Sequence, residues 1–336
     1  MSKLTQIERP DEDTLKLLAL SGSLNKREAL AAQDGLALAL APVIREGILY
    51  VDNLQGIFSQ IPLVGNETHE VPLDFLAPGE EDMYIAYSVP GHGRIPENAV
   101  EGDYIKIGTY QTANSIDMLL KYARDAGWNV VVRAMEILQA GFVKKFSDDG
   151  WHSLITAAVD RNVAVYDADA AVGQLTKRLI SLCKTVMQRQ SGGNGIGAGR
   201  LTDMYLSPEG VEDVLNWGVD QLDDTTRRAI HMMAENGQSL TRMFGVNLHG
   251  MYEFGANQEY QDYYTGTLSG TFPGSDVELI IGLDNSRDDS FVMPVKETVS
   301  VFVDDNLHRQ QRMGWYAWQE SGFGVLDNRR TIVATF

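Results

Sequence analysis

The stretch GWYAWQESGFGVLDNRRTIVATF, residues 314–336, contains two strand-type runs separated by glycines and other turn residues. In the first run Trp315 and Ala317 share one face of an extended strand, and Tyr316 and Trp318 share the other, because side chains alternate along a strand. Both faces therefore need cover, which is typical of a strand in a packed core. A ligand-stacking platform is the alternative interpretation. Neighbouring copies of the chain are a further source of cover.

The tail from Asp276 onward is rich in strand-type runs of β-branched and aromatic residues. These runs are VELIIGL at 277–283, KETVSVFV at 296–303, RMGWYAWQ at 312–319 and VLDNRRTIVAT at 325–335. We expect the end of the chain to return to the sheet of a first domain.

The middle of the chain has the periodicity of helices. Asn114 is a suitable cap for a helical turn, and after Gly127 a longer apolar stripe follows. The two stripes are Ile116, Leu119, Leu120 and Ala123, and then Val131, Ala134, Met135, Leu138 and Phe142. The second stripe predicts a long helix that lies across a sheet. A third helix is expected over about 170–190, with Cys183 in its buried stripe.

A second domain is expected to start near Arg200. Its first helix has Ser207 as N-cap and Pro208 as first helical residue, where the missing N–H has no cost. Asp223 or Asp224 caps another helix. The segment SGGNGIGAGR at 191–200 is interpreted as a flexible connector between the domains, since it lacks the G-x-G-x-x-G spacing of a phosphate-binding loop and follows a helix.

The N-terminal part predicts an arm followed by a protruding hairpin. Helix formers at 27–41 stop before Pro42, and short β-type runs such as MYIAYSV at 83–89 then alternate with turn signals. Residues 65–105 contain nine acidic residues and one arginine, a net charge of −8. A hairpin this polar has little core of its own and should pack on something else.

Composition indicates a folded protein of about two domains. The chain has 336 residues, 44% hydrophobic and 22% charged, and a formal net charge of −18. Such a charge repels phosphate backbones and argues against a conventional nucleic-acid binder. The N-terminus lacks the pattern of a secretory signal, and no apolar stretch is long enough to span a bilayer. Cys183 is the only cysteine, which excludes an intramolecular disulfide and favours a reducing compartment.

No residues form a recognisable catalytic, cofactor-binding or metal-ligating pattern. Neighbouring acids such as Asp148 and Asp149 point apart, the six histidines occur singly, and Cys183 is expected to be a core residue rather than a reactive thiol. The run DNSRDDS at 284–290 has some features of a calcium loop but lacks its glycine and distal glutamate. We therefore assign no catalytic residue, cofactor or metal site, and expect the chain not to be an enzyme.

Four segments carry a resemblance to a known family. They are MYLSPEGVEDVLNW at 204–217, LDDTTRRAIHMM at 222–233, FGVNLHGMYEFG at 244–255 and the closing stretch at 314–336. With the order of arm, acidic extension, long helix and glycine-rich connector, the chain resembles the major capsid protein of tailed double-stranded DNA bacteriophages. The resemblance implies the Hong Kong 97-type fold, of class α+β.

The family's architecture implies five segments in this chain. They are an N-terminal arm at 1–63, an extended hairpin loop at 64–105 that lies over an adjacent subunit, a peripheral domain with a long spine helix at 106–199, an axial domain at 200–280, and C-terminal strands at 281–336 that return to the peripheral domain. Some relatives cross-link subunits through a lysine in the hairpin, but residues 65–105 contain none, so cross-linking is not expected.

The resemblance implies that copies of the chain assemble as pentamers and hexamers into an icosahedral shell around phage DNA. The implied partners are other copies, a separate scaffolding protein, a portal, a decoration protein, and DNA contacted weakly without sequence specificity; no membrane is involved. The location would be the virion, after assembly in the bacterial host cytoplasm. Two rival hypotheses remain: an encapsulin-type nanocompartment shell and an acidic α+β enzyme with a dispersed active site.

Overall fold

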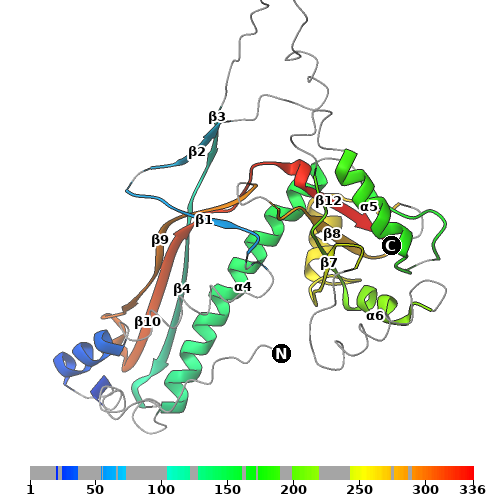
Figure 1. The fold of residues 1–336 in the computed structure, drawn as a ribbon. Coiled ribbons are helices and arrows are strands. Elements are labelled where there is room, and N and C mark those ends of the chain that lie inside the picture. The colour runs from blue at the N-terminus through cyan, green and yellow to red at the C-terminus, as the bar shows by residue number, and fades with distance from the viewer. Residues whose placement is uncertain are drawn as a thin grey trace, which may run out of the picture. The chain divides into compact units, whose positions relative to one another are not determined.

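Figure 1 shows the computed structural model, which describes residues 20–21, 25–36, 54, 56–65, 67–72, 104–121, 128–160, 164–171, 173–189, 199–218, 243–273, 276–286 and 290–336. The described residues combine long strands with helices, as the α+β class requires. They divide into two compact units. Unit 1 is Met1–His69, Ile107–Gly150 and Met293–Phe323, and unit 2 is Glu70–Lys106, Trp151–Val292 and Gly324–Phe336.

The sheet of unit 1 is antiparallel and has the strand order β1-β9-β10-β4, with β11 pairing to β9. Its strands are β1 (Ser59–Pro62), β4 (Tyr110–Leu119), β9 (Phe291–Val303), β10 (Arg312–Ser321) and β11 (Gly324–Val325). β10 lies between β4 and β9, so that Trp315 is opposite Ile116 on one side and Val303 on the other. The strand-type runs at 296–303 and 312–319 are thus confirmed as neighbours in one sheet.

The long helix α4 (Trp128–Asp160) confirms the spine predicted after Gly127. Its buried residues Ala134, Leu138 and Phe142 pack with Trp315 and other residues of one sheet face. The side chains of Val131 and Met135 lie outside the described part. The first half of α4, up to Gly150, belongs to unit 1, and the rest belongs to unit 2.

The helical turn expected from Asn114 is wrong, because these residues form β4. Ile116, Met118 and Leu120 alternate with outward residues, and Met118 and Leu120 are buried. Ile116, Leu119 and Leu120 fit a helical stripe as well as a strand on a short window. Pairing with β10 over ten residues decides for the strand.

The sheet of unit 2 has the strand order β5-β12-β8-β6-β7. Its strands are β5 (Ala164–Val165), β6 (Asp203–Leu206), β7 (Asn247–Gly250), β8 (Leu279–Leu283) and β12 (Thr331–Thr335). Two pairs, β12 with β5 and β6 with β7, are parallel, and the pairs of β8 with β12 and β6 are antiparallel. All residues of β8 and β12 are buried.

Two helices border the core of unit 2, α5 (Lys177–Arg189) and α6 (Pro208–Asn216). The capping prediction for α6 is confirmed, since the Ser207 hydroxyl accepts from the Gly210 N–H and Pro208 is the first helical residue. α5 begins at Lys177 rather than near 170. Gly173 has a φ of +62°, which interrupts a helix, and Thr176 accepts from the Leu179 N–H at the new start.

The C-terminal strands divide between the two sheets. β9 and β10 return to the sheet that contains β4, whereas β8 and β12 lie in the sheet of unit 2. Four shorter helical turns complete the described elements: α8 (Glu259–Asp262), Tyr263–Thr267, Leu307–Gln310 and Asn328–Arg330.

The described part of the expected hairpin is its base, where β2 (His69–Pro72) pairs with β3 (Tyr104–Ile107). Residues 26–36 are helical, as the N-terminal arm predicted. The run at 83–89, the glycine-dense segment up to residue 198 and the helix after Asp223 or Asp224 lie outside the described residues.

Candidate functional site

The sheet of unit 1 has an inner face that packs on α4 and an outer face that does not. Trp315 and Ala317 are buried on the inner face, as their alternation predicted. Tyr316 and Phe302, on the other face, are 41% and 38% exposed, and Trp318 beside them is partly buried. We call these three residues the outer aromatic cluster.

The rings of the outer aromatic cluster hold one another. Tyr316 is directly opposite Phe302 across the strand pair, and their rings stack with centroids 5.4 Å apart. Trp318 meets Phe302 edge to face at 5.8 Å. Aromatic pairs in these arrangements are favourable beyond the area they bury, so the cluster is a preformed apolar surface.

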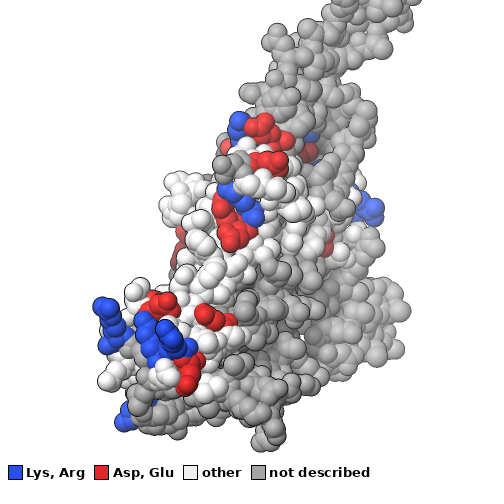
Figure 2. Space-filling model, turned by 90° about the vertical axis from the view of Figure 1, so that its left-hand side faces the viewer, with Lys and Arg blue, Asp and Glu red and all other residues white. Residues whose placement is uncertain are grey.

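Charged residues near the outer aromatic cluster are paired with each other. Arg312 and Asp117 form an ion pair of 2.6 Å, and Lys296 and Glu320 form one of 3.0 Å. Hydrogen bonds from Thr109 and Lys296 lower the pKa of Glu320. Figure 2 looks onto the side of the molecule where β9 and β10 lie, and uncharged residues occupy a broad area between groups of charged ones.

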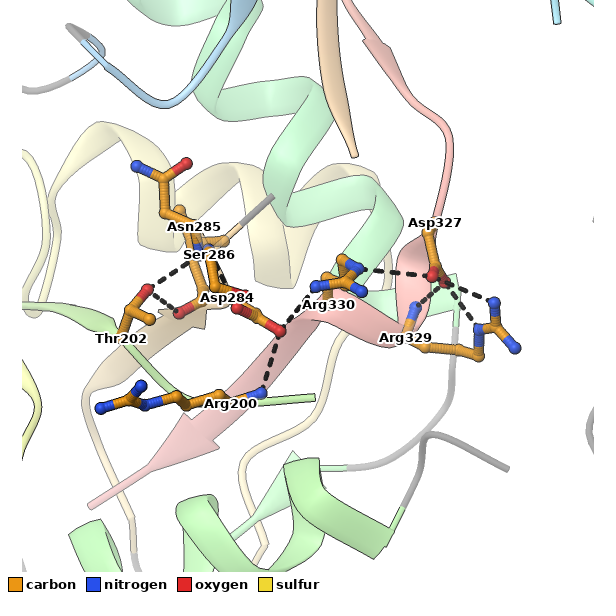
Figure 3. Close-up of polar contacts among 9 residues, drawn as sticks. Arg200, Thr202, Asp284, Asn285, Ser286, Asp327, Arg329 and Arg330 are labelled. Atoms are coloured by element: carbon orange, nitrogen blue, oxygen red, sulfur yellow. Dashed lines mark hydrogen bonds and ion pairs between the residues drawn. The ribbon is translucent and has the colours of Figure 1, made fainter. Parts of the chain in front are cut away.

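A buried ion pair joins the loop after β8 to the residues before β12 (Figure 3). Arg330 donates to Asp284 at 2.7 Å, and the side chains are 5% and 0% exposed. The same Asp284 carboxylate accepts the Arg200 N–H at 2.9 Å and the Ser286 N–H at 3.0 Å. Asp284 therefore has protein donors on both oxygens.

This pairing gives the first residue of the run at 284–290 a structural role. Arg330 occupies the place beside Asp284 that a bound cation would need, and the arginine already neutralises the carboxylate. Residues 287–289 lie outside the described part of the chain. Nearby, Asp327 accepts from the Arg329 side chain at 2.8 Å; burial opposes its ionisation, but the contacts with Arg329 lower its pKa.

A second buried carboxyl group lies at the start of α6. The Ser207 hydroxyl donates to Glu278 while it accepts from the Gly210 N–H. Burial raises the pKa of Glu278, and the nearby carboxylates of Glu209 and Asp213 raise it further. Glu278 thus retains its proton to a higher pH in the folded chain than in the unfolded chain.

Two histidines have defined partners in unit 2. His249 lies 3.0 Å from Asp203 and stacks on Tyr205 with ring centroids 4.7 Å apart. Burial opposes the ionisation of Asp203, but hydrogen bonds from His249 and its neighbours lower the pKa. His152 stacks on Tyr263 at 3.9 Å.

The tyrosine group at 260–264 lies around a buried tryptophan of α4. Trp151 has its ring centroid 6.1 Å from Tyr260, 5.7 Å from Phe254 and 4.7 Å from Tyr205. Tyr260 and Tyr264 are buried. These aromatics are core residues of unit 2.

Cys183 is fully buried in α5, and burial raises the pKa of its thiol to about 12. This confirms the core interpretation, since a reactive cysteine needs a low pKa and access to solvent. Asp148 and Asp149 lie one helical turn from Lys144 and Lys145, with which they form ion pairs. In the described ranges, His, Cys, Asp and Glu do not gather in threes as metal ligands would.

Phe302 is the member of the outer aromatic cluster that sequence reasoning did not single out. It is 14 residues from Tyr316 in the chain, and only the strand register brings them together. The alternation in both runs is the signal that could have found it. Among the helices that the structure describes, none has both the length and the hydropathy of a bilayer span.

No protein-family profile and no curated protein matches the sequence. Solved structures do. That of "Mycobacterium phage Bobi" has a TM-score of 0.54 and 13% identity, and covers 86% of this chain and 89% of that one. "Asymmetric unit of bacteriophage PhiM1 mature capsid" has a TM-score of 0.54 and 12% identity, over 84% and 86%. "Capsid structure of the Cyanophage P-SCSP1u" has a TM-score of 0.53 and 12% identity, over 83% and 86%.

The chain has the Hong Kong 97-type capsid fold. The match spans more than four fifths of the chain and therefore includes both sheets and α4. The fold class and the family resemblance inferred from the sequence are confirmed at the level of the fold.

Proposed function

We propose that this chain is the major capsid protein of a tailed double-stranded DNA bacteriophage. Copies of it would assemble as pentamers and hexamers into an icosahedral shell that encloses the genome. The observation that carries this proposal is the fold match to two phage capsid structures over 83–84% of the chain. The paired charges and core aromatics described above also support a structural role rather than an enzymatic one.

The two units correspond in this proposal to the two domains of the shell subunit. Unit 1, with the sheet of β4, β9 and β10, is the peripheral domain, and unit 2 is the axial domain around the capsomer centre. This division places α5 and β12 in the axial domain, whereas the sequence had placed them within 106–199 and 281–336. Residues 64–105 are the extended loop over an adjacent subunit.

The charge of the chain is suited to a container for DNA. A wall of subunits with a net charge of −18 repels the genome's phosphates, so the packaged DNA is contacted weakly and without sequence specificity. Other partners in this proposal are a scaffolding protein, a portal and a decoration protein. The subunit is made and assembled in the cytoplasm of the bacterial host and ends in the virion.

Electron microscopy and size-exclusion chromatography of the purified chain test the proposal. We expect pentamers, hexamers or closed hollow particles in the megadalton range. A compact monomer or small oligomer at all concentrations would contradict it. The contents of particles recovered from cells carrying the whole phage then distinguish the two shell hypotheses: DNA supports a capsid, and an enclosed enzyme indicates a nanocompartment.

A further inference from the structure

The outer aromatic cluster is the apolar surface of unit 1 that the fold leaves uncovered. The inner face of the same strands is buried against α4, while Phe302 and Tyr316 keep 38% and 41% of their surface exposed. Aromatic side chains at the centre of a polar rim are typical of the residues that contribute most to a protein–protein interface. The rings already hold one another, so little side-chain entropy remains to be lost on binding.

The surrounding charges favour a protein partner over a nucleic acid. A platform on which bases stack normally lies in a positively charged groove. Here the nearby cations are engaged by carboxylates, Arg312 by Asp117 and Lys296 by Glu320. The face between them is uncharged in Figure 2, so a phosphate backbone gains no free cation at these two positions.

The chain itself contains a segment with the complementary composition. Residues 65–105 have a net charge of −8 and yet include the apolar run MYIAYSV at 83–89. Such a run needs an apolar surface, and its acidic neighbours need one without surplus acid. The outer aromatic cluster, with its two neutralised ion pairs, meets both requirements.

We propose that the outer aromatic cluster of one copy binds residues 83–89 of a second copy of this chain. This inference rests on the proposed shell function, because it names the surface through which neighbouring subunits hold each other. It assigns to Phe302, Tyr316 and Trp318 the energetic centre of that contact.

Substitution of the two exposed rings tests the energetic role. In the double variant Phe302→Thr, Tyr316→Thr, we expect the yield of particles or capsomers to fall at least tenfold at equal protein concentration, while circular dichroism of the unassembled chain is unchanged. Ile137→Thr is the matched control, because it removes an apolar side chain that is 52% exposed on α4 of the same unit. Assembly of the double variant at the yield of the control would overturn the proposal.

Photo-crosslinking identifies the occupant and does not depend on closed particles. Tyr316 is replaced by p-benzoylphenylalanine in a 15N-labelled chain, which is mixed with unlabelled chain, irradiated and digested. Adducts between labelled residue 316 and unlabelled peptides from 83–89 support the proposal. Adducts within one chain, adducts to other segments of a second copy, adducts to added single-stranded DNA, or no adducts would each overturn it.

The two experiments separate this inference from the proposed function. Particles that form from the wild-type chain, with no 83–89 adduct at residue 316, would leave the shell function standing and remove the inference. A wild-type chain that forms no particles contradicts the shell function, and the adducts in its smaller oligomers still decide the contact.

Discussion

At the residue scale, the Arg330–Asp284 pair contributes to stability mainly through the penalty for separating it. Both side chains are almost fully buried, so removal of the arginine leaves a carboxylate without its counter-charge in a region that water does not reach. The carboxylate would retain only the N–H groups of Arg200 and Ser286.

We therefore expect Arg330→Met to lower the free energy of unfolding by about 3–5 kcal/mol, measured by urea denaturation. Arg312→Met is the control, since its pair with Asp117 is 46% and 42% exposed and should cost less than about 1 kcal/mol. The double variant R330M/D284N should recover part of the loss. Equal costs for Arg330→Met and Arg312→Met would contradict the prediction.

Glu278 makes stability depend on pH in the direction opposite to an ordinary carboxylate. Its pKa is raised in the folded chain, so the folded state holds the proton more tightly than the unfolded state. The resulting stabilisation is complete below the ordinary pKa of a glutamate and is lost as the pH rises through the raised value.

Glu278→Gln should therefore increase the melting temperature at pH 7 relative to wild type and have a smaller effect at pH 4. The glutamine still offers an oxygen to the Ser207 hydroxyl. Glu212→Gln, an exposed change on the same helix, should shift the two melting temperatures equally at both pH values. A constant difference between Glu278→Gln and wild type from pH 4 to pH 8 would show that Glu278 is not protonated in the fold.

Local signals identified some of these residues and missed others for a physical reason. Ser207 and Cys183 could be predicted because a cap and a helical stripe depend on neighbours within a few residues. Asp284 and Arg330 are 46 residues apart, and strand pairing brings them together. No local pattern carries that information.

At the element scale, α4 is held by one row of side chains. Leu138 is fully buried against the sheet, whereas the adjacent Ile137 is exposed. Leu138→Ala should lower the free energy of unfolding by about 2–5 kcal/mol, because the removed atoms leave a cavity. Ile137→Ala removes a similar volume from the surface and should cost less than about 1 kcal/mol. Similar losses for both variants in chemical denaturation would contradict this packing.

The same elements show how far sequence periodicity reaches. The spine helix could be predicted because its apolar positions repeat over several turns, and the four tail runs could be predicted from their β-branched residues. The helix expected from Asn114 failed because three apolar positions fit both periods, and the deciding partner, β10, is almost 200 residues away. The division of β10 and β12 between two sheets was hidden for the same reason.

At the scale of the whole molecule, a subunit of net charge −18 meets electrostatic repulsion when it approaches another copy. The apolar contacts of the proposed shell act only at short range, so the repulsion acts first and limits the rate of encounter. Added salt shortens the distance over which it acts, from about 10 Å at 0.1 M to about 3 Å at 1 M.

Assembly of the purified chain, followed by light scattering, should therefore become several times faster as sodium chloride rises from about 0.05 to about 0.5 M. Sucrose at matched osmolality is the control, because it strengthens apolar burial without screening charge. A rate that rises equally in sucrose would attribute the effect to apolar contacts alone. Faster assembly at low salt would mean that complementary patches, such as the acidic segment 65–105 and a basic surface of the next copy, outweigh the net repulsion.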